Sequence, residues 1–265
     1  MKIKQILKEL VRKFKYLIYI PRGISRKPHD KFSIISDLFP VRNENGWETF
    51  FELLNIPFLI SGGNNLNSSA VELVFFGKDG RRILSRSIEE STASRRTLNI
   101  SEIVSENNLT NVGTFALFHH HNIELNGAFL TERGYTGYKR TQDEIRGYVH
   151  GNYDSVQNYG KKITTIGNQG IFNRYYFVQH KFRGEALYEI FLTNPSQKPA
   201  KIQFELIKSG EKIIESRKIE SRGITTFNFY LTDKETANFA IKSRLYLGRP
   251  VVFRVNQKSF DVFHG

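Results

Sequence analysis

Two stretches decide the fold of this 265-residue chain: Ala70-Val71-Glu72-Leu73-Val74-Phe75-Phe76 and, 130 residues later, Ala200-Lys201-Ile202-Gln203-Phe204-Glu205-Leu206. In the second stretch every other residue is apolar, which is the pattern of a strand with one face buried and the other in water. Each stretch is followed by a turn that contains glycine, Lys78-Asp79-Gly80 or Lys208-Ser209-Gly210, and then by a further apolar segment. The two stretches therefore predict antiparallel strands joined by short turns.

The similarity continues along both halves of the chain in the same order. Its members are Phe51–Asn55 with Glu189–Asn194, Thr97–Ile100 with Thr226–Phe229, and Tyr148–Gly151 with Val262–Gly265. Matches that keep one order on strand-like segments exceed what chance similarity explains. They indicate an internal repeat, in which each of the matched segments is a strand and His150 and His264 occupy equivalent ends of the final strands.

We therefore predict an all-β protein made of two related antiparallel β-sandwich modules in tandem, at 45–155 and 160–265. An arm over residues 1–44 precedes them. The arm is expected to begin with a basic amphipathic helix, and Ser36 to Pro40 is predicted to form a turn near its end.

Composition excludes several classes of function. The chain has no cysteine, so disulfides, thiolate metal sites and cysteine nucleophiles are absent. No apolar run approaches the roughly 18 residues of a membrane-spanning helix. The N-terminus also lacks the long apolar core of a signal peptide. These features predict a cytoplasmic protein that is peripheral at the inner membrane if the arm binds lipid.

The positive charge is concentrated in the arm. Of the net charge of +13, residues 1–31 carry +8 and the other 234 residues +5. Residues 2–19 place apolar side chains at spacings of three and four, which predicts a helix with one apolar stripe. Such a helix could dock through residues 1–20 on an anionic membrane or on a partner, or could pack on the protein itself. The candidate docking residues are Lys4, Lys8, Arg12, Lys13, Phe14 and Lys15.

A polar aromatic stretch from Glu132 to Tyr159 is the candidate binding surface. Tyrosine rings offer flat apolar faces, and neighbouring polar side chains can hydrogen-bond sugar hydroxyls or hold a carboxylate. The candidate residues are Tyr135, Tyr138, Arg146, Tyr148, His150, Asn152, Tyr153 and Asp154. A glycan or a protein would be the partner. The competing interpretation is that these tyrosines pack between the modules.

Histidines provide an alternative, enzymatic hypothesis. His119 and His121 would share one face of a strand, and His150 could supply a third imidazole to a metal ion. No carboxylate completes the set at a recognisable spacing, so we expect polar strand ends here, with no metal, cofactor or catalytic residue. Nucleic-acid binding is not predicted either, because no known recognition motif accompanies the basic composition.

The second half resembles bacterial fibronectin-like or immunoglobulin-like modules in Phe191–Ser196, Ala200–Leu206, Gly210 and Gly223. This resemblance implies a fold and no activity. Ser36–Pro40 together with His150–Asn152 resembles uncharacterised bacterial proteins encoded among surface-polysaccharide genes. That resemblance implies a non-catalytic binding or accessory protein near surface-polysaccharide machinery.

Overall fold

The structure, a computed structural model, describes residues 29, 34–56, 59, 70–88, 94–120, 129–132, 134–151, 154–160, 162–178, 181–246 and 249–265. Nearly all of the secondary structure in these ranges is β-strand, as the sequence predicts, and most strand pairs are antiparallel. The helix predicted at residues 2–19, with its candidate docking residues Lys4, Lys8, Arg12, Lys13, Phe14 and Lys15, lies outside the described ranges.

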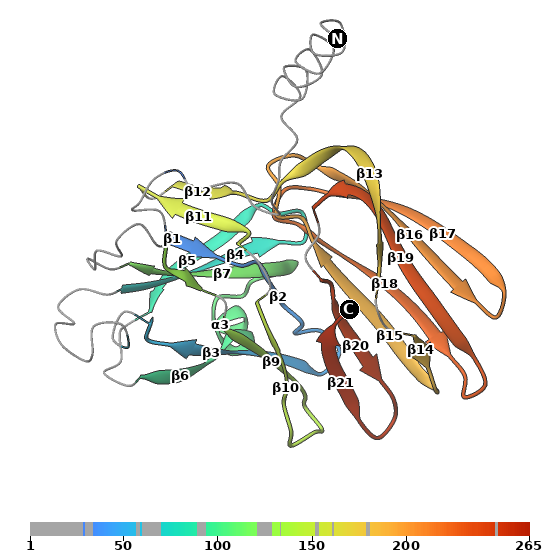
Figure 1. Cartoon of the computed structure of the whole chain (residues 1–265). Helices are drawn as coiled ribbons and strands as arrows, with labels where there is room; N and C mark the ends of the chain where they lie inside the picture. Colours follow the sequence, from blue (N-terminus) through green and yellow to red (C-terminus); the bar gives the residue numbers. More distant parts are fainter. Residues whose placement is uncertain are drawn as a thin grey trace, which may run out of the picture.

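Two four-stranded sheets enclose the main core of the first half (Figure 1). One sheet has the order β6 (Arg95–Asn99), β3 (Trp47–Leu54), β9 (Tyr135–Arg140), β10 (Gly147–His150). The other has the order β2 (Phe39–Pro40), β7 (Val112–His120), β4 (Ala70–Gly77), β5 (Arg82–Ile88). Phe51, Phe75 and Phe115 are fully buried between the sheets.

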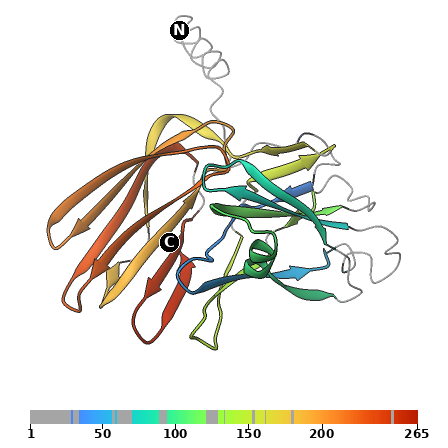
Figure 2. The ribbon, with the colours of Figure 1, turned by 180° about the vertical axis from the view of Figure 1, so that it is seen from behind.

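A short helix, α3 (Ile100–Glu106), packs beside β3 in the first half (Figure 2). The sequence pattern predicts that Ile100 continues a strand, and the structure corrects this. The helix forms because the side chain of Asn99 accepts a hydrogen bond from the backbone N–H of Glu102, which caps the first turn. Ile100 and Val104, four residues apart, then point into the same core.

A third sheet covers the outer side of the β7–β4 layer, with the order β12 (Lys162–Thr165), β11 (Val156–Tyr159), β1 (Ile34–Ser36), β8 (Thr131–Glu132). Strands β1 and β2 correct two predictions: residues 34–41 belong to the folded body and not to the arm, and Ser36 and Phe39–Pro40 are strand residues. Their apolar side chains explain this, because Ile35, Leu38 and Phe39 are each at most 3% exposed.

The second half is built from two further sheets. One has the order β13 (Gln169–Phe177), β19 (Thr236–Leu245), β16 (Ala200–Lys208), β17 (Glu211–Ile219), with β14 (Phe182–Arg183) also pairing with β19. The other has the order β18 (Ile224–Leu231), β15 (Ala186–Thr193), β20 (Val251–Val255), β21 (Phe260–His264). Their inner faces share one aromatic core that includes Phe204, Phe229 and Phe239.

The strand order is the same in the two halves. The sheet β6-β3-β9-β10 corresponds to β18-β15-β20-β21, and the path β7-β4-β5 corresponds to β19-β16-β17. The stretches that open the sequence analysis, Ala70–Phe76 and Ala200–Leu206, lie in the matching strands β4 and β16. The chain therefore uses one pairing scheme twice.

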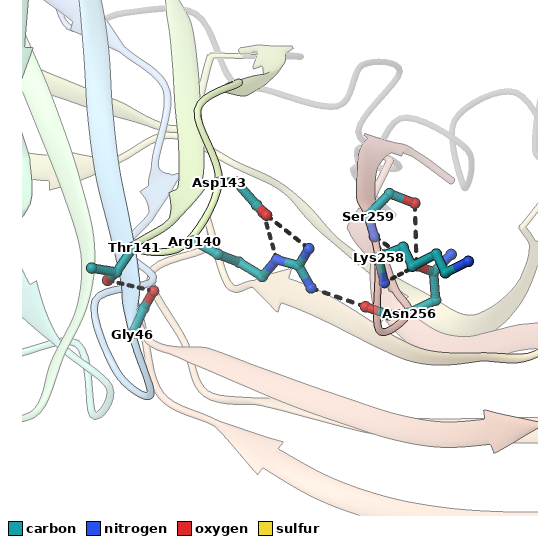
Figure 3. Close-up of polar contacts among 7 residues, drawn as sticks. All are labelled: Gly46, Arg140, Thr141, Asp143, Asn256, Lys258 and Ser259. Atoms are coloured by element: carbon teal, nitrogen blue, oxygen red, sulfur yellow. Dashed lines mark hydrogen bonds and ion pairs between the residues drawn. The ribbon is translucent and has the colours of Figure 1, made fainter.

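The halves meet along an apolar seam with polar contacts around it. Trp47 and Tyr138 of the first half pack edge-on against Phe253 of the second, at ring-centroid distances of 5.5 and 4.8 Å. At one end of the seam Arg140 is held by Asp143 and donates through Nη1 to the carbonyl of Asn256 at 2.9 Å (Figure 3). These contacts join the first sheet of the first half to β20 and the turn that follows it.

Strands β10 and β21, which occupy corresponding positions in the two halves, lie side by side in this seam. His264 at the end of β21 donates through Nε2 to the carbonyl oxygen of His150 at 2.6 Å, and the two rings are 5.1 Å apart. The two histidines therefore contact each other. Equivalent positions in a repeat need not be in contact, so this is an additional finding of the structure.

Candidate functional site

The outer face of the sheet β6-β3-β9-β10 gathers polar and aromatic side chains. Side chains alternate along β3, so Phe51 and Leu53 enter the core while Phe50 and Glu52 point outward. We call this surface the polar-aromatic face. Its members are Phe50, Glu52, Arg95, Thr97, Tyr135, Arg146, Tyr148 and His150.

Strand register brings these side chains together from distant parts of the sequence. Glu52 of β3 lies opposite Thr97 of β6 on one side and opposite Tyr135 of β9 on the other. Tyr135 in turn lies opposite His150 of β10. Cross-strand neighbours on one face are close enough to interact, so the row forms one continuous surface.

Glu52 is the centre of the polar-aromatic face. Its carboxylate accepts hydrogen bonds from Arg95 Nε at 2.9 Å, Thr97 Oγ1 at 3.1 Å and the Tyr148 hydroxyl at 3.1 Å. Arg146 Nη1 lies 3.9 Å away. Burial alone would raise the pKa of Glu52, but the hydrogen bonds from Arg95, Thr97 and Tyr148 outweigh it and lower that pKa below the ordinary value of a glutamate. Glu52 is therefore an anion in the folded protein at neutral pH.

The lowered pKa predicts an acid-dependent stability. A carboxylate whose pKa is lower in the folded than in the unfolded state stabilises the fold above the unfolded pKa, and that contribution disappears as pH falls through the folded value. Wild type should therefore melt at a higher temperature than Glu52→Gln at pH 7, and the difference should shrink below about pH 4.5. Melting curves of both proteins from pH 7 to pH 3 measure this; a difference independent of pH would contradict it.

Two tyrosine rings of the face remain open to solvent. Tyr135 is 50% exposed and Tyr148 is 40% exposed, although the hydroxyl of Tyr148 is bound to Glu52. The Tyr148 ring lies over Gly137, where a Cβ would come within 2.7 Å of a ring carbon. The Arg146 guanidinium stacks over Phe50, with Cζ 3.9 Å from the ring centroid. The result is a surface of flat rings around a fixed network of charges.

The structure brings together four of the eight predicted binding residues: Tyr135, Arg146, Tyr148 and His150. Tyr138 is a correction, because it is fully buried in the seam, donates to the carbonyl of Pro40 at 2.9 Å and has a pKa raised by burial. Asp154 is half-buried and engaged in contacts of its own. Asn152 and Tyr153 lie outside the described ranges.

Sequence reasoning missed Phe50, Glu52, Arg95 and Thr97. The alternation in Trp47–Leu54 does signal that Glu52 faces away from the core. Nothing in the sequence signals that Arg95 and Tyr148, which follow Glu52 by 43 and 96 residues, converge on its carboxylate.

The histidines proposed for a metal have other contacts. His119 Nε2 lies 2.6 Å from Glu132 Oε2, and both side chains are at most 2% exposed. Glu132 also accepts from the backbone N–H of Gly134 at 2.5 Å. His150 donates to the carbonyl of Gly151 at 2.6 Å, and His121 lies outside the described ranges. Among the residues described, no three His, Asp or Glu side chains are grouped so as to hold a metal ion.

The polar-aromatic face offers two kinds of groups that can contact a ligand. Exposed rings can stack on flat apolar faces of a ligand, and the fixed carboxylate and guanidinium groups can exchange hydrogen bonds with its hydroxyls.

Within the described ranges, no helix has the length and apolarity needed to cross a bilayer. No protein-family model and no curated protein sequence matches the chain.

Proposed function

We propose that this protein is a non-catalytic binding protein whose polar-aromatic face recognises a glycan. One observation carries the proposal: Glu52, 4% exposed, is held by Arg95, Thr97 and Tyr148 beside two exposed tyrosine rings. A preorganised polar network next to aromatic platforms loses little entropy on binding, which favours recognition of a hydroxyl-rich ligand.

The scaffold in this proposal is a pair of related sandwich modules in tandem. The shared strand order of the two halves and the matched sequence segments support a common origin. The polar-aromatic face lies in the first module, and the second module supports it through the apolar seam at Tyr138 and Phe253. A fold of this kind positions a site and does not itself specify a ligand.

The setting that we propose is the inner membrane, beside machinery that handles surface polysaccharide. The resemblance of Ser36–Pro40 and His150–Asn152 to proteins encoded among such genes supports it. The basic N-terminal segment supports it as well, because a helix with an apolar stripe and five net positive charges over residues 2–19 would bind anionic headgroups. In this arrangement the protein is cytoplasmic and peripheral.

A glycan array probed with the purified full chain tests the function. Wild type should bind a defined subset of glycans, and Tyr135→Ala should weaken that binding about tenfold or more, the loss expected for one aromatic contact of ~1.4 kcal/mol. Tyr230→Ala is the matched control, because Tyr230 is 47% exposed on β18 of the other half.

Two results would contradict the proposal. One is the absence of glycan binding together with specific capture of a protein by wild type but not by Tyr135→Ala, which would make the surface a protein interface. The other is glycan binding that Tyr135→Ala and Tyr230→Ala weaken equally, which would place the ligand elsewhere.

A further inference from the structure

The sheet β13-β19-β16-β17 has an outer face that turns away from the first half of the molecule (Figure 1). Side chains alternate on its strands, so that Phe204 and Ile241 enter the core while Glu205 and Lys242 face outward. Strand register fixes the other outward positions. Phe177, Ala240, Glu205 and Ile214 form one row across the four strands.

This outer face exposes large apolar side chains. Phe177 is 73% exposed, Ile214 53%, Tyr175 51% and Ile207 46%. The rings of Tyr175 and Phe177 are nearly parallel, with centroids 6.4 Å apart, so they present one apolar ridge along β13. An exposed cluster of this kind costs solubility and marks a contact surface more often than chance placement does.

Basic side chains lie on the three strands beside the apolar ridge. The outward-facing basic residues are Lys201, Lys212, Lys218, Lys242 and Arg244. Against them stand Glu205, which pairs with Lys212 at 2.8 Å, and Glu220, which pairs with Lys218 at 2.6 Å just beyond the end of β17. On and beside β16, β17 and β19, these five basic and two acidic side chains carry a net charge of +3.

The charge of the face decides between its possible occupants. A second copy packed face to face would bring +3 against +3, and the N-terminal residues 1–31 carry a net charge of +8 of their own. Both are repelled at low ionic strength. An anionic partner is attracted. Exposed Phe177, Ile207 and Ile214 gain from leaving water only if that partner also offers hydrocarbon, which a polysaccharide or a nucleic-acid backbone does not.

We propose that the outer face of β13-β19-β16-β17 docks on an anionic lipid bilayer. Its lysines and Arg244 would lie at the headgroup phosphates, and Tyr175, Phe177 and Ile214 would enter the interface between headgroups and acyl chains. This contact is separate from the polar-aromatic face, which lies in the other half of the molecule. It does not depend on glycan binding.

Co-sedimentation of the full chain with vesicles tests the proposal. Vesicles of equal parts phosphatidylglycerol and phosphatidylcholine should bind wild type at low salt, and vesicles of phosphatidylcholine alone should bind it far more weakly. Lys201→Gln with Arg244→Gln should weaken binding about 25-fold, since each basic side chain near the bilayer contributes about fivefold. Phe177→Ser with Ile214→Ser should weaken it tenfold or more.

Two control proteins separate the face from other contributions. Ile145→Ser with Lys258→Gln changes an exposed isoleucine and an exposed lysine on hairpin turns away from the face, and should bind as wild type does. A full chain with Lys4, Lys8, Arg12, Lys13 and Lys15 all changed to glutamine should retain binding that the face substitutions then abolish. Melting temperatures of the surface variants should stay close to that of wild type, because the substituted residues are largely exposed.

Three results would overturn the proposal. If the variant with both Phe177→Ser and Ile214→Ser bound vesicles as tightly as wild type, the apolar side chains of this face would not contact lipid. Complete loss of binding in the protein with the neutralised N-terminal segment would assign all binding to that segment. Equal competition by soluble polyphosphate, with no effect of the apolar substitutions, would identify the face as a site for polyanions.

Discussion

Gly80→Ala is expected to lower the free energy of unfolding by about 2–6 kcal/mol, an unusually large loss for the addition of one methyl group. Gly80 has φ +78°, a conformation that strains any residue with a side chain. A Cβ at this position would also lie 1.8 Å from the carbonyl oxygen of Ser221 in the other half. Because the clash is with backbone, the two halves must move apart to relieve it.

Gly210→Ala is the matched control, since Gly210 occupies the corresponding turn of the second half. Its φ is +86°, but a Cβ there has no atom within 4 Å. Only the backbone strain applies to Gly210→Ala, so its free energy of unfolding should fall by about 1–3 kcal/mol. Urea unfolding of both variants measures the difference. Equal losses would show that the contact between Gly80 and Ser221 does not limit the approach of the halves.

Arg42→Ala is expected to destabilise the protein by about 3–5 kcal/mol, because it leaves a buried carboxylate without its partner. Arg42 forms an ion pair with Glu189 of the other half, and the two side chains are 10% and 14% exposed. The guanidinium also lies over Trp47, with Cζ 3.5 Å from the ring centroid, and 4.3 Å from that of Phe253. One side chain thus links charge and aromatic packing across the seam.

Burial governs the balance within this pair. It lowers the pKa of Arg42 to about 10 in spite of Glu189, and it raises the pKa of Glu189 in spite of Arg42. The cost of removing both charges from water is therefore large compared with their attraction. Replacing both together, by Arg42→Met with Glu189→Leu, should recover most of the stability that Arg42→Ala loses.

Lys78→Ala provides the exposed comparison for the Arg42 experiment. Lys78 pairs with Glu44 at 2.7 Å, but the two side chains are 48% and 63% exposed. Its loss should change the free energy of unfolding by about 1 kcal/mol or less. Urea unfolding of Arg42→Ala, of the Arg42→Met and Glu189→Leu double variant, and of Lys78→Ala tests the expected order of their stabilities. A small effect of Arg42→Ala, or a double replacement as unstable as the single one, would contradict the account.

Local sequence patterns predict the strands well because alternation depends only on neighbouring residues. The apolar positions of Ala200–Leu206 identify a strand with one buried face, and the glycines after Ala70–Phe76 and Ala200–Leu206 mark the turns. The same alternation bears on the candidate site. Tyr135 and Tyr138 are three residues apart, so a strand must place them on opposite faces, and only Tyr135 is available to a ligand.

Contacts between distant segments could not be predicted in this way. Glu52 receives its hydrogen bonds from Arg95, Thr97 and Tyr148, which reach it through the pairing of β3, β6, β9 and β10. Residues 34–41 entered the body for a similar reason: their few apolar side chains form strands only where the first half supplies partners at β7, β8 and β11.

The two glycine turns show most directly which features the local sequence determines and which depend on tertiary packing. Lys78-Asp79-Gly80 and Lys208-Ser209-Gly210 share the pattern Lys-x-Gly, which predicts a turn in each half, and in the structure both glycines adopt a left-handed conformation. Gly80 is pressed against the backbone of the other half, while Gly210 faces open space. The left-handed conformation of each glycine is a local property of its turn. The surroundings of that backbone depend on how the two halves pack, and no local pattern encodes that packing.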